Sequence, residues 1–143
     1  MSARLRTPPL TDPDSAAFWE GCAAGVLLGQ RCGDCGAWRW PPREHCPRCH
    51  AAAPVWERLA GTGRIAGLAV VHRPLDPTIA DELPLAVAHI ELDGTEAAIV
   101  LTSTLGTGDA GRARVGDAVA VGFLPLPDGA ALPTFTLIDN PEE

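Results

Sequence analysis

No lysine occurs anywhere in the 143 residues, which excludes Schiff-base catalysis and nucleophilic lysines. Tyrosine is absent as well, and aromatic residues make up only 5% of the chain, which weighs against a protein that binds nucleic acid by stacking bases. No apolar stretch approaches the roughly 20 residues that a membrane-spanning helix needs, and no apolar run follows the arginines near the amino terminus. We therefore expect a soluble, cytoplasmic protein with no membrane partner.

Familiar catalytic motifs are missing too. The sequence has no Gly-x-Ser-x-Gly motif of the kind that presents a serine nucleophile. Gly61-Thr62-Gly63 precedes a predicted strand rather than a helix, so we interpret it as a linker and not as a phosphate-binding loop. No pattern of residues combines a nucleophile, a base and an orienting group. We expect no catalytic residues on this chain.

The net charge of −7 is unevenly distributed. Between residues 31 and 73, seven arginines face only three carboxylates, whereas from residue 74 onward two arginines oppose twelve carboxylates. The second half would repel a phosphate backbone, so nucleic acid is not an expected partner. The segment from Arg31 to Arg73 is locally basic.

The amino-terminal part of the chain predicts one helix. Residues 11–14 supply capping side chains and a proline suited to a first turn, and the helix is expected to run to about Ala24, where Gly25 permits a left-handed stop. Phe18 and Trp19 give this helix an aromatic surface. Two interpretations stay open: the helix packs on its own domain, or it docks on another protein.

Five cysteines in a chain expected in a reducing compartment indicate metal ligands rather than disulfides. Four of them form two Cys-x-x-Cys pairs, Cys32 with Cys35 and Cys46 with Cys49, which can bring four thiolates to one tetrahedral ion. Four protein ligands saturate the ion, so the sequence predicts a structural zinc without a free coordination position. Cys22 lies outside this set and is expected to be buried on the helix.

Other interpretations of the cysteine site stay open. Iron would fit the same cage, and a redox-active dithiol is a further alternative, although no βαβ pattern surrounds either pair. His45 or His50 would be a substitute ligand in a mixed site. Gly36 suits the left-handed backbone after the first pair, whereas His50 stands at the same place after the second. This predicts either a strained second knuckle or a ring that points to solvent.

The remaining pattern is that of short strands. Residues 26–31 and 37–40, bounded by Pro41-Pro42, predict a β-hairpin around the first cysteine pair. From residue 61 onward, apolar runs alternate with turn signals. Five strands are expected, over residues 64–72, 85–92, 97–103, 118–123 and 134–138. Asp93-Gly94 predicts a tight hairpin turn between the second and third of these.

Several motifs follow one another in a distinctive order over about residues 15–125. They are Phe18-Trp19-Glu20-Gly21, residues 27–36, Trp40-Pro41-Pro42, Cys46-Pro47-Arg48-Cys49, Gly61-Thr62-Gly63, residues 70–74 and Val115-Gly116-Asp117. In this order the chain resembles a bacterial and archaeal family of acyl-CoA-associated proteins with an N-terminal helix, a rubredoxin-like zinc ribbon and an OB-fold. The resemblance implies a mainly β fold with a tail and helix over 1–30, the ribbon over 31–58 and a five-stranded OB-fold barrel over 59–143.

The resemblance also implies a function. It points to a non-catalytic accessory subunit of a thiolase-fold enzyme or hydratase that acts on acyl-CoA, for example in condensation, acyl transfer or the aldolase step of steroid side-chain breakdown. Such a subunit would form a hetero-oligomer with the enzyme, stabilise it and help form its CoA-thioester site. The missing catalytic motifs and the basic ribbon agree with this expectation.

Candidate contacts for CoA or for the partner follow from this expectation. They are Trp38, Arg39, Trp40 and Arg43 on the hairpin, His72 and Arg73 just before the long loop that follows the first barrel strand, and Phe18 and Trp19 on a partner-docking helix. Arginines suit the phosphates of CoA. Two indoles on so small a hairpin either pack on the barrel or contact a partner or ligand. The histidine and arginine precede a long loop near the face where OB-folds usually bind ligands.

Functions of other classes stay open as alternatives. A single-stranded nucleic-acid-binding protein is one, because zinc ribbons and OB-folds both serve that purpose. The net negative charge and the absence of lysine argue against it. An electron carrier with iron in the cysteine cage is another.

Overall fold

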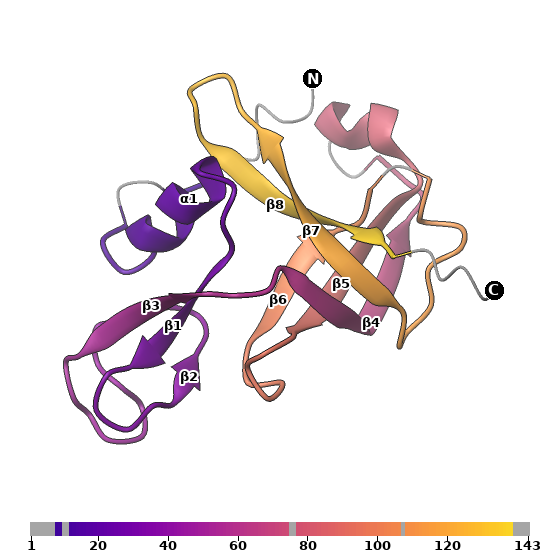
Figure 1. Ribbon diagram of the computed structural model, residues 1–143. Coiled ribbons are helices and arrows are strands. Elements are labelled where there is room, and N and C mark those ends of the chain that lie inside the picture. The colour runs from indigo at the N-terminus through magenta and orange to yellow at the C-terminus, as the bar shows by residue number, and fades with distance from the viewer. Residues whose placement is uncertain (1–7, 10–11, 75–76, 107, 139–143) are drawn as a thin grey trace.

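The computed structural model describes residues 8–9, 12–74, 77–106 and 108–138. Within them a short helix, a small three-stranded sheet and a nearly closed five-stranded barrel follow one another along the chain (Figure 1). The elements are α1 (Ala16–Ala23), β1 (Leu28–Cys32), β2 (Trp38–Arg39), β3 (Pro54–Arg58), β4 (Thr62–Val71), the 3-10 helix η2 (Pro77–Glu82), β5 (Leu85–Leu92), β6 (Val100–Thr104), β7 (Ala118–Pro125) and β8 (Ala131–Leu137). The predicted mainly β architecture is confirmed.

Helix α1 begins later than the sequence predicts. The carboxylate of Asp12 accepts hydrogen bonds from the backbone N–H of Asp14 at 3.2 Å and from the hydroxyl of Ser15 at 2.8 Å. These bonds hold residues 12–15 in a turn ahead of the helix, because an aspartate side chain competes for nearby backbone donors. Thr11, the other predicted cap, lies outside the described residues.

The carboxyl end of α1 is as predicted, and the helix packs on its own chain. Gly25 has a φ of +79°, and the N–H of Val26 donates to the carbonyl of Gly21 at 2.8 Å, which is the pattern of a Schellman cap. Phe18 and Cys22 are each 1% exposed and belong to the main core. Of the two interpretations of this helix, packing on its own domain is confirmed.

The small sheet has the strand order β2-β1-β3, with antiparallel neighbours. Strands β1 and β2 form the predicted hairpin. Strand β3 is not among the predicted strands, because four of its five residues are exposed and the sequence therefore lacks the alternation that marks a half-buried strand. It pairs along the whole of β1 and leads the chain from the ribbon into the barrel.

The barrel has the strand order β6-β5-β4-β7-β8, again antiparallel. Its first and last strands, β6 and β8, do not pair along their length. They meet at an isolated bridge between Leu105 and Phe135, and the hydroxyl of Ser103 donates to the carbonyl of Pro133 at 2.8 Å. We call the line along which β6 and β8 meet the seam. Side-chain contacts close it more than backbone pairing does.

The Gly61-Thr62-Gly63 segment is a structural part of the barrel and not a linker. Gly61 has a φ of +82°, and β4 already begins at Thr62. A Cβ on Gly63 would lie 2.5 Å from the carbonyl oxygen of Glu91 on the neighbouring strand. Glycine is required there because two strand backbones approach too closely for a side chain.

The connection from β5 to β6 is longer than the tight turn predicted at Asp93-Gly94. Strand β6 begins at Val100 rather than at residue 97, because Glu96 and Ala97 have left-handed φ values of 55° and 61° and cannot extend the strand. Thr95 is fully buried, and its hydroxyl makes two backbone hydrogen bonds that hold this turn together.

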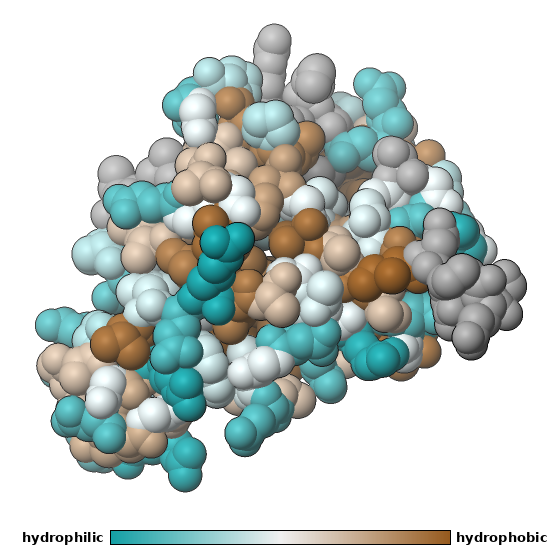
Figure 2. Space-filling model, in the orientation of Figure 1, coloured by the Kyte–Doolittle hydropathy of each residue, from teal (hydrophilic) through white to brown (hydrophobic). Residues whose placement is uncertain are grey.

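One core extends through the barrel and beneath α1. Its most buried large side chains include Phe18, Ile65, Ile90, Ile99, Val119 and Phe135. The ribbon tryptophans pack against the edge of this core. Figure 2 shows apolar side chains gathered in the middle of one face, where α1, the ribbon and the barrel meet. Among the described residues, no helix has the length and apolarity to span a membrane.

Candidate metal centre and adjacent cavities

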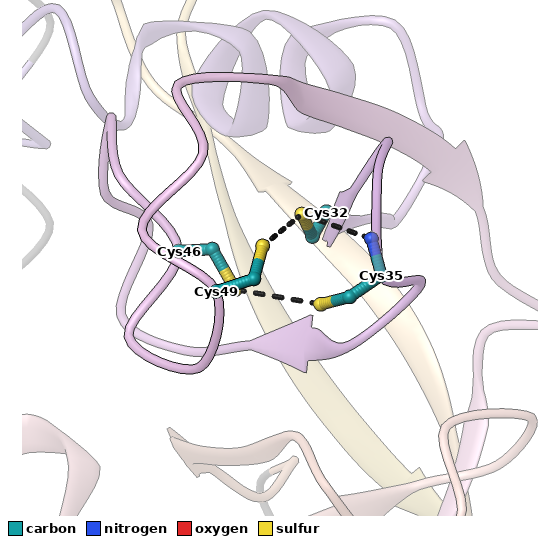
Figure 3. A group of neighbouring side chains, drawn as sticks. All are labelled: Cys32, Cys35, Cys46 and Cys49. Atoms are coloured by element: carbon teal, nitrogen blue, oxygen red, sulfur yellow. Dashed lines mark hydrogen bonds between the residues drawn. The ribbon is translucent and has the colours of Figure 1, made fainter.

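The four cysteines of the two Cys-x-x-Cys pairs converge at the end of the ribbon (Figure 3). Their sulfur atoms all lie within 4.8 Å of one another. The sulfurs of Cys32 and Cys49 are 3.6 Å apart, and so are those of Cys35 and Cys46. A tetrahedral ion with zinc–sulfur bonds of about 2.3 Å holds its ligands about 3.8 Å apart, so this arrangement fits zinc.

The two knuckles have the same backbone geometry. The N–H of Gly36 donates to the carbonyl of Cys32 at 3.0 Å, and the N–H of His50 donates to the carbonyl of Cys46 at 2.8 Å. Gly36 has a φ of +77° and His50 a φ of +65°, so both positions are left-handed. His50 is also exposed, and both parts of the prediction for this residue are therefore correct.

The thiols influence one another and are influenced by the backbone around them. The N–H of Cys35, foremost among several groups, lowers the pKa of Cys32, and the N–H of Cys49 does the same for Cys46, whose pKa falls to about 6. The N–H of Ala51 also acts to lower the pKa of Cys49, but the neighbouring sulfurs and burial outweigh it and raise this pKa to about 11. A bound divalent cation would remove this difference in pKa between the thiols, because it stabilises all four thiolates together.

The site therefore has the properties of a closed structural zinc site. All four coordination positions are taken by cysteine, which leaves none for substrate or water. Neither His45 nor His50 joins the group of potential ligands that the described residues bring together. Cys22 lies apart in the core, where burial raises the pKa of its thiol to about 12, as expected of an inert, buried cysteine.

Trp38 lies in a cavity of about 360 Å³ between the ribbon and the β5–β6 connection. This arginine cavity is lined by Arg31, Cys35, Gly36, Ala37, Trp38, Arg48, Thr95, Glu96 and Ala98. The guanidinium of Arg31 lies 4.6 Å from the centre of the Trp38 ring and forms an ion pair with Glu57 at 3.3 Å. The cavity thus presents an indole, two cations and the carboxylate of Glu96, and the excess of positive charge suits an anion with an aromatic ring.

Trp40 lines a different cavity, of about 300 Å³, on the seam side of the ribbon. This aromatic pocket is lined by Phe18, Trp19, Trp40, Leu101, Thr102, Ser103, Thr104, Leu124, Leu132, Pro133 and Thr134. The rings of Trp19 and Trp40 each lie 4.9 Å from the ring of Phe18. Both ribbon tryptophans named as candidates therefore pack on the barrel, as one interpretation of them held, and each also lines a cavity.

Arg39 is not an available contact, which corrects the expectation for this residue. It is 4% exposed, and its Nε donates to the amide oxygen of Gln30 at 2.6 Å. The backbone N–H of Arg43 donates to the same oxygen at 2.8 Å and thereby brings the following loop close to Arg39. Gln30 is not among the predicted site residues, because its only mark in the sequence is that it is a polar residue two positions before the first metal ligand.

The other candidates are spread over the molecule. Phe18 is buried in the core and is therefore not available for docking, which corrects the expectation for this residue. Trp19 is half-buried. Arg43 is exposed on the ribbon. His72 and Arg73 are exposed after the end of β4, up to about 30 Å along that strand from its ribbon end. They line neither of the two cavities.

Known proteins resemble this chain along most of its length. The family model described as the rubredoxin-like zinc ribbon domain of ChsH2 matches residues 19–55, and the one described as the C-terminal OB-fold domain of ChsH2 matches residues 56–124. A chain in the solved structure of the Ltp2-ChsH2(DUF35) aldolase has a TM-score of 0.80 and 29% identity to this chain. The likeness covers 92% of this chain and 98% of that one.

Two curated relatives match over part of their own length. A probable enoyl-CoA hydratase alpha subunit of Thermomonospora curvata is 32% identical over 131 residues, which are 92% of this chain and 40% of that protein. A DUF35 domain-containing scaffold protein of Methanocaldococcus jannaschii is 38% identical over 69 residues, which are 47% of this chain and 48% of that protein. Each match thus spans less than half of the relative's own length.

Proposed function

The chain belongs to the ChsH2 family, in which a rubredoxin-like zinc ribbon precedes a C-terminal OB-fold domain, and on this basis we propose that it is a non-catalytic accessory subunit of an acyl-CoA enzyme. One observation carries the proposal: the likeness to the chain of the Ltp2-ChsH2(DUF35) aldolase extends over 98% of that chain. The names of the two curated relatives, a hydratase subunit and a scaffold protein, support an enzyme partner.

The partner we propose is a thiolase-fold enzyme or a hydratase that acts on an acyl-CoA. The chain binds this enzyme, stabilises it and contributes one wall of the site that holds the CoA thioester. Support comes from the charge of the ribbon, where Arg31 and Arg48 line one cavity beside an indole. Arginines bind phosphate groups through several donors at once, and an indole offers a stacking surface for a base.

The residues of this chain act by holding and orienting. Bound zinc cross-links the two knuckles and thereby fixes the ribbon, which is too small to fold on hydrophobic burial alone. Arg31 is held in place by Glu57 and by the carbonyl of Gly36, to which its Nε donates at 2.8 Å. Its guanidinium is therefore positioned before a ligand arrives, which lowers the entropy lost on binding.

Co-expression tests the proposal. The chain and the acyl-CoA enzyme encoded beside it are produced together, and we expect them to elute as one complex whose thioester activity is lost when this chain is omitted. A double variant, Cys35→Ser with Cys49→Ser, should abolish the complex by releasing zinc. Val115→Ser serves as the control, because Val115 is 63% exposed and lines neither cavity. An enzyme that is stable and fully active without this chain would contradict the proposal.

A further inference from the structure

The aromatic pocket lies at the seam, where the barrel is not closed by backbone pairing. One wall consists of residues 101–104 of β6 and residues 132–134 of β8, and the opposite wall consists of Phe18 and Trp19 of α1 and Trp40 of the ribbon. The three parts of the chain therefore meet around one cavity. A volume of about 300 Å³ lies at the lower end of the range of roughly 300–1,000 Å³ for ligand sites.

The walls of this pocket are uncharged. Seven of the eleven lining residues are aromatic, aliphatic or proline, and the other four are serine or threonine. No carboxylate, arginine or histidine is among them, so the pocket has no charged partner for a phosphate or an ammonium group. It suits a neutral, mostly apolar ligand that carries a few hydrogen-bonding groups.

Some of the polar side chains in the pocket already have hydrogen-bond partners, and one does not. Ser103 donates to the carbonyl of Pro133, and Thr134 donates to the carbonyl of Thr104 at 2.9 Å, so these side chains are occupied in closing the seam. Thr102 is exposed, and its hydroxyl has no partner among the described residues. Thr102 is thus the hydroxyl in the pocket that remains available to a ligand.

The backbone of Thr102 is available as well. Strand β6 pairs with β5 alone, and the N–H of Leu105 donates to the carbonyl of Ala86 at 3.0 Å. Because bonded and non-bonded pairs alternate along an antiparallel ladder, Thr102, which lies opposite His89, is a non-bonded pair. Its N–H and carbonyl therefore point away from β5 toward the seam. One ligand amide can pair with this N–H or with this carbonyl, and two successive amides can pair with both, as a neighbouring strand would.

The aromatic pocket and the arginine cavity both border the ribbon. Trp40 lines the first and Trp38 the second, and the Cα atoms of two residues so close in the chain lie at most about 7 Å apart. A ligand with a neutral arm and a charged end that spans this edge of the ribbon would contact both. A peptide strand of the partner fits less well, because the carbonyl of Thr104, the next outward-facing residue in the pocket, already accepts from Thr134, whereas strand addition uses several residues in a row.

On these grounds we propose that the aromatic pocket binds the uncharged, amide-bearing arm of an acyl thioester, with an amide of the arm paired to the backbone of Thr102 and its phosphates directed to the arginine cavity. The inference rests on the proposed function for the identity of the thioester. Within that function it assigns the arm and the phosphates to different cavities of this chain.

Proline substitution on β6 gives a specific test. Thr102→Pro removes the outward N–H without breaking a bond to β5, and Val100→Pro does the same two residues earlier, outside the pocket. The probe is a pantetheine thioester without the nucleotide, and binding to the isolated zinc-loaded chain is followed by tryptophan fluorescence. We expect Thr102→Pro to weaken binding by about 3- to 10-fold and Val100→Pro by less than 2-fold.

A second pair of variants keeps the test decisive if the prolines disturb the fold. Thr102→Trp fills the pocket and should weaken binding at least 10-fold, whereas Val115→Trp, at an exposed position that lines neither cavity, should not. In the complex with the enzyme, Thr102→Trp should raise the KM for acyl-CoA while the complex still forms.

The two proposals fail in different ways. If wild-type chain forms an essential complex but Thr102→Trp changes neither probe binding nor KM, the pocket assignment is overturned and the accessory function stands. If Thr102→Trp prevents the complex while the wild-type chain does not bind the probe, the pocket holds a side chain of the partner, which also overturns the assignment. If no complex forms, the accessory function fails, and probe binding by the isolated chain still decides the role of the pocket.

Discussion

Replacing His50 by glycine is expected to tighten zinc binding, because His50 holds the left-handed backbone that the second knuckle requires. A left-handed conformation costs a non-glycine residue about 1–2 kcal/mol. Glycine in turn loses about 0.5–1 kcal/mol more on ordering than other residues do. His50 is exposed and is not part of the core, so its replacement loses no packing, and the difference between the two terms is a gain of roughly 0.5–1 kcal/mol. It corresponds to about two- to fivefold tighter binding where folding and metal binding are coupled.

The reverse change in the first knuckle is the matched control. At Gly36 the nearest atom to an added Cβ is Nε of Arg31 at 3.9 Å, so Gly36→His introduces the backbone strain without a clash. We expect zinc binding to weaken by a similar factor of about two to five. Competition with a chromophoric chelator on the full chain measures both effects. Equal affinities for wild type and both variants would refute the reasoning, and weaker binding by His50→Gly would show that the imidazole itself helps to hold the metal.

Four further predictions concern the fold around the site. Removal of zinc by a chelator should lower the protection of backbone amides from hydrogen exchange across residues 32–58. The barrel amides should stay protected, because the barrel strands are held by the hydrophobic core, and this difference distinguishes local from general unfolding. Gly63→Ala should lower the free energy of unfolding by about 1–3 kcal/mol, because its Cβ would lie 2.5 Å from a backbone oxygen. Gly67→Ala is the control: its Cβ would lie 3.7 Å from its nearest neighbour, so the melting temperature should stay almost unchanged. Arg39→Met should leave stability unchanged or raise it, because the terminal guanidinium nitrogens are buried without partners among the described residues. Gln30→Ala should cost about 1–3 kcal/mol in denaturant unfolding by removing the acceptor for two donors.

The sequence predicts those parts of the fold that depend on local patterns. The barrel strands alternate apolar and polar residues between turn signals, and α1 stops at a glycine, so both can be recognised without the structure. Strand β3 cannot, because it is mostly exposed and is held by pairing to β1 alone. The seam between β6 and β8 cannot either, since it depends on how strands distant in sequence close around a core.

The same distinction holds for the site. The metal ligands follow from spacing within two short knuckles, which is a local property. The burial of Arg39 depends on contacts between separate segments. Arg39 on β2 lies opposite Gln30 on β1, and the backbone of the following loop also bonds to Gln30, so the charge becomes buried. Thr102 carries no motif at all. Its importance arises only because its backbone faces a seam that the sequence does not reveal.

The central claim is that this chain is a zinc-held scaffold on which an acyl-CoA enzyme depends. Its most direct test is to titrate the purified, zinc-loaded chain into the purified partner enzyme and to follow thioester turnover. Activity is expected to be near zero for either protein alone and to rise to a plateau as the complex forms, and chain stripped of zinc should not support it. Full turnover by the enzyme alone, or turnover by this chain in isolation, would contradict the account.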